Sequence, residues 1–382
     1  MKTETAISVV VPIYNASAYL REALNSLLAQ TFKNFEAICV NDGSTDDSLD
    51  ILRSYADKDS RIRIIDQPNG GYGKAMNTGF DASVGKYLAI LEPDDYLPEN
   101  AYEVLYKLAE EYQLDIAKGC VQKFIGDGAD RVFSEPSSFA KGNLNVTFCP
   151  RNTLGVFRFN MNTWTCLYNI DFLRKNNIRH NESAGAAYQD NGMFILSFSY
   201  ANKLRCVNDV VNFHRMDNPQ SSNKRMHKNP NIMRDEYAYI RHKLQQTPEI
   251  WKKTQAAYVL LRMMNHRSIY DKLQYGMQLE YLEEYRKELL EMQNMDCSML
   301  SAENQKFMKE ILQSPLLHML CNALREELKV SSSSIINNFK ARNGETSLKE
   351  VKALSGEGKA PKKRKRRSFF GLSIGKKNNS LN

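Results

Sequence analysis

Near its N-terminus the chain reads Ile7-Ser8-Val9-Val10-Val11-Pro12-Ile13-Tyr14-Asn15, a run of β-branched apolar residues that ends in two polar ones. Such a run is typical of a strand that is covered on both faces, as in a parallel sheet. Pro12 and Asn15 interrupt its apolar character, and the run is too short to span a bilayer. We therefore interpret it as a buried strand and not as a signal peptide.

A helix and further strand–helix pairs follow this strand. Apolar residues recur at helical spacing in Leu20, Ala23, Leu24, Leu27 and Leu28. The later strand candidates are Phe35–Val40, Arg61–Ile65 and Tyr87–Leu91, and the later helix candidates are Ser48–Tyr55, Lys74–Ala82 and Glu99–Tyr112. Strands that alternate with helices predict an α/β domain with a mainly parallel sheet.

The pattern changes twice further along the chain. From Asn231 to about Val330 it is strongly helical, and Trp251–Tyr275 and Gln278–Met292 contain no Pro or Gly. Beyond that the composition becomes polar and basic. We therefore predict three parts: an α/β domain over residues 1–225, a helical region over 226–330, and a disordered polybasic tail over 331–382.

The net charge of +8 is concentrated in the tail. Residues 331–382 contain thirteen Lys and Arg against three acidic residues, which leaves the other 330 residues at about −2. A body with almost no net charge argues against a basic groove for nucleic acid. We expect no nucleic-acid partner.

The seven cysteines form no CxxC pair and no spacing typical of zinc ligands. They predict a reducing compartment, with most thiols acting as small buried hydrophobes. No stretch reaches the ~18 apolar residues that a membrane helix needs. We expect a cytoplasmic protein that is either soluble or peripheral at the inner face of the cytoplasmic membrane.

Polar residues directly follow three of the predicted strands: Tyr14-Asn15, Asn41-Asp42 and Glu92-Pro93-Asp94-Asp95. In α/β sheets, ligands gather at the carboxyl ends of the strands. Three carboxylates within four residues repel one another unless they are solvated or bind a cation, and hard oxygen ligands suit Mg²⁺ or Mn²⁺. The alternative is an acidic turn that begins the next helix.

Four segments together resemble family 2 glycosyltransferases, whose Rossmann-like α/β fold is called GT-A. They are Val10–Asn15, Val40–Asp46, Ala75–Gly79 and Leu91–Tyr96, and they occur in the order and spacing of that family. The resemblance covers roughly Ile7–Ser222 and is strongest to bacterial polysaccharide-building members. It implies a GT-A domain, followed here by the helical region and the basic tail.

The resemblance implies a nucleotide-sugar donor and assigns it binding residues. These are Pro12, Tyr14, Asn15, Asp42, Lys74, Asn77, Glu92 and Asp95. The first three would surround the nucleotide base, and Asp42 would contact the base or the ribose. The alternative for Asp42 is an Asn-Asp-Gly turn with a helix cap.

Asp94 matches the metal-binding aspartate of the DxD motif of this family, which implies Mn²⁺ or Mg²⁺ as cofactor. Glu92 stands at the first position of the motif, where Asp is more usual, and Asp95 is a supporting carboxylate. A divalent cation would neutralise the charge that develops on the leaving diphosphate.

The segment Tyr188–Phe194 resembles the part of the family that supplies the catalytic base, and Asp190 is the matching residue. The resemblance implies an inverting reaction in which this carboxylate deprotonates the acceptor hydroxyl. The alternative is a surface aspartate that begins a helix.

Two further segments resemble the acceptor side and a loop of bacterial members. Asn162–Tyr168 contains Trp164, whose indole can stack on a sugar ring of the acceptor, although a core position is an equal alternative. His214–Ser222 contains Arg215, which could pair with diphosphate oxygens. An inert surface loop is the alternative there.

The tail combines six consecutive cations, Lys362–Arg367, with Phe369, Phe370, Leu372 and Ile374 and then Lys376-Lys377. Each basic residue near an anionic leaflet contributes on the order of 1 kcal/mol, and buried aromatic rings add to it. We therefore expect Lys362 to Lys377 to contact an anionic membrane surface. A solvated tail or a nuclear-targeting or nucleic-acid-binding segment would have a similar composition.

Together these features predict a metal-dependent glycosyltransferase, a hexosyl- or N-acetylhexosaminyltransferase. The resemblance implies transfer of a sugar from a nucleotide-sugar donor to a saccharide or lipid-linked acceptor in cell-surface polysaccharide biosynthesis, and it favours a UDP-linked donor. One rival is a sugar nucleotidyltransferase, which would need a glycine-rich loop where Pro12–Asn15 stands. The other is a non-catalytic scaffold that acts at a membrane surface through its tail.

Overall fold

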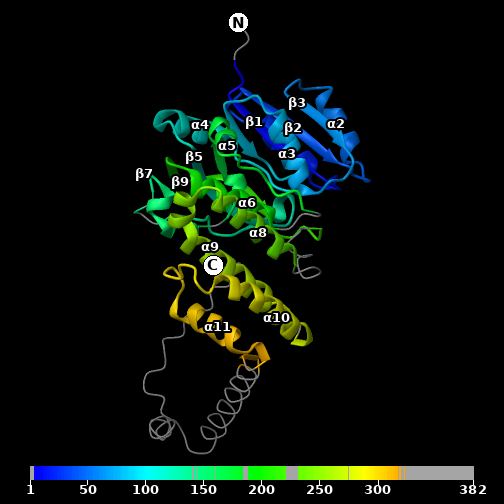
Figure 1. The fold of residues 1–382 in the computed structure, drawn as a ribbon. Helices are drawn as coiled ribbons and strands as arrows, with labels where there is room; N and C mark the ends of the chain where they lie inside the picture. Colours follow the sequence, from blue (N-terminus) through cyan, green and yellow to red (C-terminus); the bar gives the residue numbers. More distant parts are fainter. Residues whose placement is uncertain are drawn as a thin grey trace, which may run out of the picture. The chain divides into compact units, whose positions relative to one another are not determined.

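The computed structural model describes residues 4–319 except 140, 141, 143, 160, 184–187, 221–230, 274 and 317, and it also describes Asn322. The chain divides into two compact units (Figure 1). The first comprises Met1–Lys272 and Met295–Met299, and the second Leu273–Asn294 and Leu300–Asn382.

The first unit is built on a nine-stranded sheet with the order β3-β2-β1-β4-β8-β5-β9-β7, in which β6 pairs with β5 off this path. Its strands are β1 Ile7–Ile13, β2 Phe35–Asp42, β3 Ile62–Gln67, β4 Tyr87–Ile90, β5 Ile116–Ile125, β6 Val132–Phe133, β7 Thr147–Phe148, β8 Cys166–Asn169 and β9 Leu204–Arg215. The first four strands are parallel to one another. This confirms the predicted α/β domain.

Continuous burial explains why the parallel half reads as unbroken apolar runs. Every residue of β1 and β2 is buried, because helices cover both faces. Val9 and Val11 belong to the large cluster that also holds residues of α1 and α4. On the opposite face, Ile38 and Val40 pack with Ala75 of α3.

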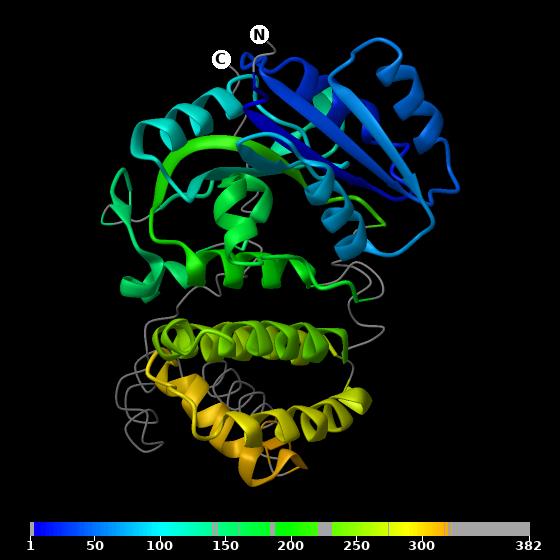
Figure 2. The same ribbon diagram turned by 45° about the horizontal axis from the view of Figure 1, so that its top comes forward.

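The second half of the sheet departs from the simple alternation. Strand β8 lies between β4 and β5 and is antiparallel to both, so β4 and β5 run in the same direction. Strand β9 then pairs in parallel with β5, with register shifts near Cys120. Figure 2 shows β9 as a long, bent strand in green, whose end comes close to the end of β4 through the bridge between Tyr96 and Phe213.

The helices of the first unit are α1 Leu20–Leu28, α2 Ser48–Ala56, α3 Tyr72–Ala82, α4 Ala101–Tyr112, α5 Ile170–Lys175, α6 Gln189–Tyr200, α8 Asn231–Gln245 and α9 Pro248–Tyr270. Short 3-10 turns occur at Gly128–Asp130, Pro150–Asn152, Leu154–Arg158 and Thr163–Thr165. Helix α8 packs on α6 and α9 packs on α8. The first unit therefore continues past residue 225, at which the predicted α/β domain ends.

Helices α10 Tyr275–Met292 and α11 Ala302–Gln313 belong to the second unit. Arg286 of α10 donates a hydrogen bond to the Leu312 carbonyl at 3.0 Å. The stretch Trp251–Tyr275, which contains no Pro or Gly, is not one helix, because α9 ends at Tyr270 and a turn precedes α10.

Several predictions concern residues that the structure does not describe. The tail, including Lys362 to Lys377, lies outside the described residues, and so do Ser221 and Ser222. Within the described residues, six cysteines are present as free thiols. In the same part of the chain, no helix is both long enough and apolar enough to cross a membrane.

Candidate active site

The acidic cluster Glu92–Asp95 forms a tight turn directly after β4, in which the Asp95 amide donates to the Glu92 carbonyl at 3.1 Å. The carboxylates of Glu92, Asp94 and Asp95 lie in different surroundings. Each of them therefore has a different chemical role.

Asp95 is a structural link. It is 1% exposed, and its Oδ1 accepts from the Arg215 amide and from His214 Nδ1, both at 3.0 Å. Burial disfavours a charged His214, yet the neighbouring Asp95 outweighs burial and raises the pKa of this imidazole. Asp95 thus ties the end of β4 to the end of β9, and this differs from the predicted contact with the donor.

Glu92 and Asp94 are held less completely. The Tyr72 hydroxyl donates to Glu92 at 2.7 Å, and burial raises the pKa of Glu92 to about 8. The Asn218 side chain donates to Asp94 at 2.8 Å, and burial together with Asp95 raises the pKa of Asp94. The negative charge of both carboxylates is therefore not balanced by neighbouring positive charge.

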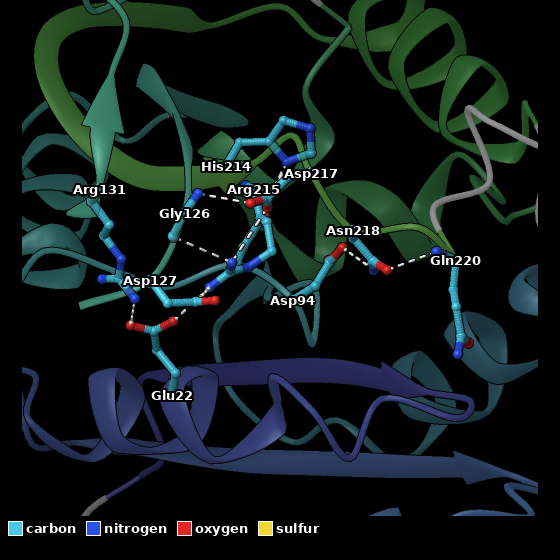
Figure 3. Close-up of polar contacts among 11 residues, drawn as sticks. Glu22, Asp94, Gly126, Asp127, Arg131, His214, Arg215, Asp217, Asn218 and Gln220 are labelled. Atoms are coloured by element: carbon cyan, nitrogen blue, oxygen red, sulfur yellow. Dashed lines mark hydrogen bonds and ion pairs between the residues drawn. The ribbon is translucent and has the colours of Figure 1, made fainter. Parts of the chain in front are cut away.

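The guanidinium of Arg215 is surrounded by carboxylates. It lies 2.9 Å from Asp127, 3.1 Å from Glu22 and 3.4 Å from Asp217, and its side chain is 1% exposed. Figure 3 shows it directed at Glu22 and Asp127, whereas Asp94 faces Asn218. The predicted pairing of Arg215 with diphosphate oxygens is not supported, because three carboxylates already neutralise this cation.

Arg215 instead anchors the segment that follows β9. Asp217 accepts from the Gly126 amide at 2.7 Å, and Glu22 also pairs with Arg131. From this anchor the chain reaches Asn218, which contacts Asp94 and accepts from the Gln220 amide at 2.8 Å (Figure 3).

Asp42 organises the loop at the carboxyl end of β2. Its carboxylate accepts from the Gly70 and Gly71 amides at 2.9 Å and from Gln67 at 2.8 Å. Strand β2 extends to Asp42, which pairs with Gln67 of β3, whereas the predicted strand ends at Val40. A bound base or ribose would share these oxygens with the loop.

The end of β1 presents one free aromatic ring. Tyr14 is 50% exposed, whereas Pro12 is buried and pairs with Val40. The side chain of Asn15 accepts from the Thr45 amide at 2.8 Å and so fixes the neighbouring turn. Of these three predicted donor residues, Tyr14 has the most accessible side chain.

Asn77 of α3 clamps a distant segment. It donates to the His180 carbonyl and accepts from the His180 amide, both at 3.0 Å, and it donates to Glu182 at 2.9 Å. In this conformation Asn77 therefore holds His180 and Glu182 in place, whereas the prediction puts it near the nucleotide. Lys74 is half exposed, with its ammonium group 3.7 Å from Glu182, and it remains available to an anionic ligand.

Asp190 lies in the first turn of α6, immediately after Gln189. The preceding Tyr188 has a φ of +67°, a left-handed conformation that turns the chain sharply into the helix. Burial raises the pKa of Asp190 to about 6. The charge of Asp190 adds to the rise in the pKa of Glu92, so the structure brings the predicted base to the acidic cluster.

Trp164 lies against the same site. Its ring centroid is 5.3 Å from that of His214, and its indole nitrogen has no hydrogen-bond partner among the described residues. The ring is half-buried and not part of the core. An acceptor sugar that stacked there would lie beside the His214–Asp95 pair.

Sequence reasoning missed four residues of this site: Tyr72, His214, Asn218 and Glu236. Glu236 of α8 is fully buried, accepts from Asn181 at 3.0 Å, and has its pKa raised to about 8 by burial. His214 and Asn218 lie in the segment His214–Ser222, which resembles a loop of bacterial members. Tyr72 lies between Gly71 and Gly73 at the start of α3, and Glu236 has no signal beyond its helical context.

Across the described residues, no three His, Cys, Asp or Glu side chains gather into a group that could hold a metal ion by itself. A cation at Asp94 would therefore need ligands from the substrate.

Comparisons with known proteins fit this geometry. The profile of the family described as "Glycosyl transferase family 2" matches residues 8–175. Glycosyltransferase GlyG of Streptococcus pneumoniae is 31% identical over 212 residues, which cover 55% of this chain and 70% of GlyG.

Two other relatives match over smaller shares of their length. Glycosyltransferase GlyA of Streptococcus pneumoniae is 43% identical over 124 residues, 32% of this chain and 18% of GlyA. The uncharacterized glycosyltransferase EpsJ of Bacillus subtilis is 32% identical over 220 residues, 56% of this chain and 62% of EpsJ. The chain thus spans less than two thirds of these two proteins.

The fold resembles that of S. aureus TarS 1-349, crystallised in complex with UDP-GlcNAc. The TM-score is 0.58 at 19% identity, and the likeness covers 74% of this chain and 80% of the other. It confirms the predicted GT-A fold. Because the family profile matches from β1 through α5 and GlyG is matched over 70% of its length, the chain belongs to glycosyltransferase family 2.

Proposed function

We propose that this glycosyltransferase moves a sugar from a UDP-linked donor to a hydroxyl of a saccharide or lipid-linked acceptor, with inversion and with Asp190 as the base. The observation that carries the proposal is the position of Asp190, whose pKa burial raises to about 6, beside the acidic cluster. The UDP-GlcNAc complex of TarS supports the choice of donor nucleotide.

The donor would lie along the carboxyl ends of β1, β2 and β4. Tyr14 offers an exposed ring to the base, Asp42 offers carboxylate oxygens to the base or ribose, and Lys74 offers a cation to the phosphates. These three groups come from separate segments that one sheet edge brings together.

Asp94 fits a Mg²⁺ or Mn²⁺ ion of the kind that one carboxylate and substrate phosphates bind. Its pKa is raised by burial and by Asp95, so a cation would relieve an uncompensated charge. Glu92 would support the same ion. When bound, the ion would act as a Lewis acid toward the diphosphate.

In the proposed reaction, Asp190 takes the proton of the acceptor hydroxyl as the oxygen bonds to the anomeric carbon. The bond from that carbon to the diphosphate oxygen breaks, and UDP leaves with the electron pair. A carboxylate with a pKa of about 6 is mostly ionised at neutral pH and still basic enough to share the proton.

The test is the release of UDP from a panel of UDP-sugars, measured with and without Mg²⁺ or Mn²⁺. Asp94→Ala should abolish metal-dependent hydrolysis, and full activity in this variant would remove the metal assignment. Asp190→Asn should still bind UDP in calorimetry while transfer falls by about 10²- to 10⁴-fold. Normal transfer in this variant would reject Asp190 as the base.

We further propose that the acceptor belongs to cell-surface polysaccharide biosynthesis and that Lys362–Lys377 holds the enzyme at an anionic membrane. The composition of the tail supports this proposal. Deleting Lys362–Asn382 should shift the protein from the membrane fraction to the soluble fraction and leave UDP-sugar hydrolysis unchanged. An unchanged distribution between fractions would reject the anchoring role.

A further inference from the structure

A cavity of about 160 Å³ lies next to β5, and none of the residues assigned to the donor or to catalysis lines it. Its walls include Lys118 of β5, Ser138 and Phe139 after β6, Arg158 and Phe159 at the end of the Leu154–Arg158 turn, and Thr165. Pockets that enclose drug-sized ligands measure roughly 300–1,000 Å³. This cavity is therefore of a size for one sugar unit or one charged substituent.

Lys118 supplies a buried positive charge at this cavity. The residue is 2% exposed, and its ammonium group donates to the Thr165 hydroxyl at 2.6 Å and to the Asn162 carbonyl at 2.8 Å. Its third contact is the Cys166 sulfur at 3.5 Å, a weak acceptor that an anionic oxygen would readily replace. Among the described residues, no carboxylate forms an ion pair with it. A buried charge without a counter-ion is costly, which indicates that a ligand supplies the negative charge.

Arg158 adds a second cation at the rim. It is exposed, and the one partner of its guanidinium within the described residues is the Met299 carbonyl at 2.6 Å. Most of its five N–H groups therefore remain free for oxyanion recognition, which a guanidinium does in bidentate fashion.

The cavity also has an apolar wall. Phe139 and Phe159 meet edge to face with their ring centroids 4.9 Å apart. Aromatic rings pack against the apolar face of a sugar, while the hydroxyl of Ser138 is exposed at the rim. Two cations, an aromatic pair and hydroxyl groups together suit a sugar that bears an anionic group.

The same 3-10 turn, Thr163–Thr165, contributes to the cavity and to the candidate active site. Thr165 lines the cavity and contacts Lys118, whereas the adjacent Trp164 packs on His214, which is bonded to Asp95. One short turn therefore connects the ring proposed for the acceptor with a wall of the cavity.

We propose that this cavity is an acceptor subsite that binds a phosphate or carboxylate group carried by the acceptor saccharide, with Lys118 as its floor and Arg158 at its rim. The assignment to the acceptor rests on the proposed glycosyl transfer. The presence of an anion site does not.

Saturation-transfer NMR on the full chain, with UDP added to fill the donor site, tests the proposal. The probes are 4-nitrophenyl glucoside, its 6-phosphate and 4-nitrophenyl glucuronide. At least one anionic probe should bind about tenfold more tightly than the neutral one, as expected for a charge-assisted hydrogen bond. Tighter binding of the 6-phosphate would identify the group on the acceptor as a phosphate, and tighter binding of the glucuronide would identify it as a carboxylate.

Lys118→Met and Arg158→Gln should each reduce this preference, and Lys107→Met, a cation on the exposed face of α4, should retain it. Because Arg158 is exposed, its variant keeps the test valid if Lys118→Met fails to fold. Equal binding of all three probes by the wild type, or an undiminished preference in both variants, would overturn the proposal. UDP-sugar hydrolysis without acceptor should be normal in both variants. If the wild type does not hydrolyse UDP-sugars, the proposed function is rejected, and the anion site is still judged by the binding of the three probes.

Discussion

Adjacent residues of one short motif carry different tasks. Asp94 has a single hydrogen-bond donor and a raised pKa, whereas Asp95 is enclosed between the Arg215 amide and His214. Motif resemblance treats both as donor-site carboxylates, because sequence order cannot show which of two neighbouring side chains faces inward. The structure assigns chemistry to the first and architecture to the second.

This difference predicts a large loss of stability in one of two matched variants and a small change in the other. Asp95→Ala leaves a buried imidazole and a backbone amide without their acceptor, so the free energy of unfolding should fall by about 2–4 kcal/mol. Asp94→Ala should change it by less than about 1 kcal/mol. Urea unfolding followed by circular dichroism measures both, and equal losses would contradict the division of roles.

The raised pKa of Asp190 predicts how activity depends on pH. A base must be unprotonated, so kcat/KM for transfer should be highest above the pKa of about 6 and fall tenfold per pH unit well below it. Initial rates measured between about pH 5 and pH 8 check this. A rate that stays level through pH 6 would mean that another group accepts the proton.

At the scale of single elements, α6 shows how one residue can be singled out while the element around it is missed. The resemblance implies that Asp190 is the base, whereas a helix start belongs to the alternative, a surface aspartate; α6 begins at Gln189. Ten of its residues are buried, because α8 covers the side that faces away from the sheet. Its apolar residues do not follow a one-sided helical pattern, so the sequence offered no face to assign.

Gly192 of α6 lies against the Glu236 side chain of α8. A Cβ at this position would lie 2.2 Å from the Glu236 carboxylate oxygen. Gly192→Ala should therefore lower the free energy of unfolding by about 1–3 kcal/mol, through overpacking. Gly155→Ala is the matched control, since nothing lies within 4 Å of a Cβ there.

A double-mutant cycle identifies the cause. In the Glu236→Ala background the obstacle is absent, so the additional cost of Gly192→Ala should shrink by more than about 0.5 kcal/mol. Strictly additive costs would show that Glu236 is not what excludes the side chain.

For the whole molecule, the parallel half of the sheet was predictable and the second half was not. Strands β1, β2 and β4 are continuous buried runs and β3 is the half-buried edge strand, and short helices join them, so local pattern and fold agree. Strand β8 inserts antiparallel between the consecutive strands β4 and β5, from which it is distant in sequence, and β9 follows a bent course with register shifts. Such pairings depend on long-range packing, which leaves no periodic signature in the chain.

The packing of α8 and α9 predicts where the catalytic part can be cut. A chain that ends at residue 225 would expose the buried side of α6 and lose the contact of Glu236 with Asn181. We expect it to aggregate or to unfold without cooperativity, whereas residues 1–299 should fold and bind UDP. Size-exclusion chromatography with thermal melts compares the two, and a well-folded 1–225 fragment would show that α8 and α9 are dispensable.

The buried guanidinium of Arg215 gives the site a dependence on ionic strength. Its partner Asp127 is 77% exposed, whereas the Asp95 carboxylate that holds the Arg215 amide is fully enclosed. Dissolved salt screens exposed ion pairs much more than buried contacts. Concentrated salt should therefore loosen the segment from Asp217 to Gln220 while the strands beneath it stay in place, so that donor affinity weakens before the fold does.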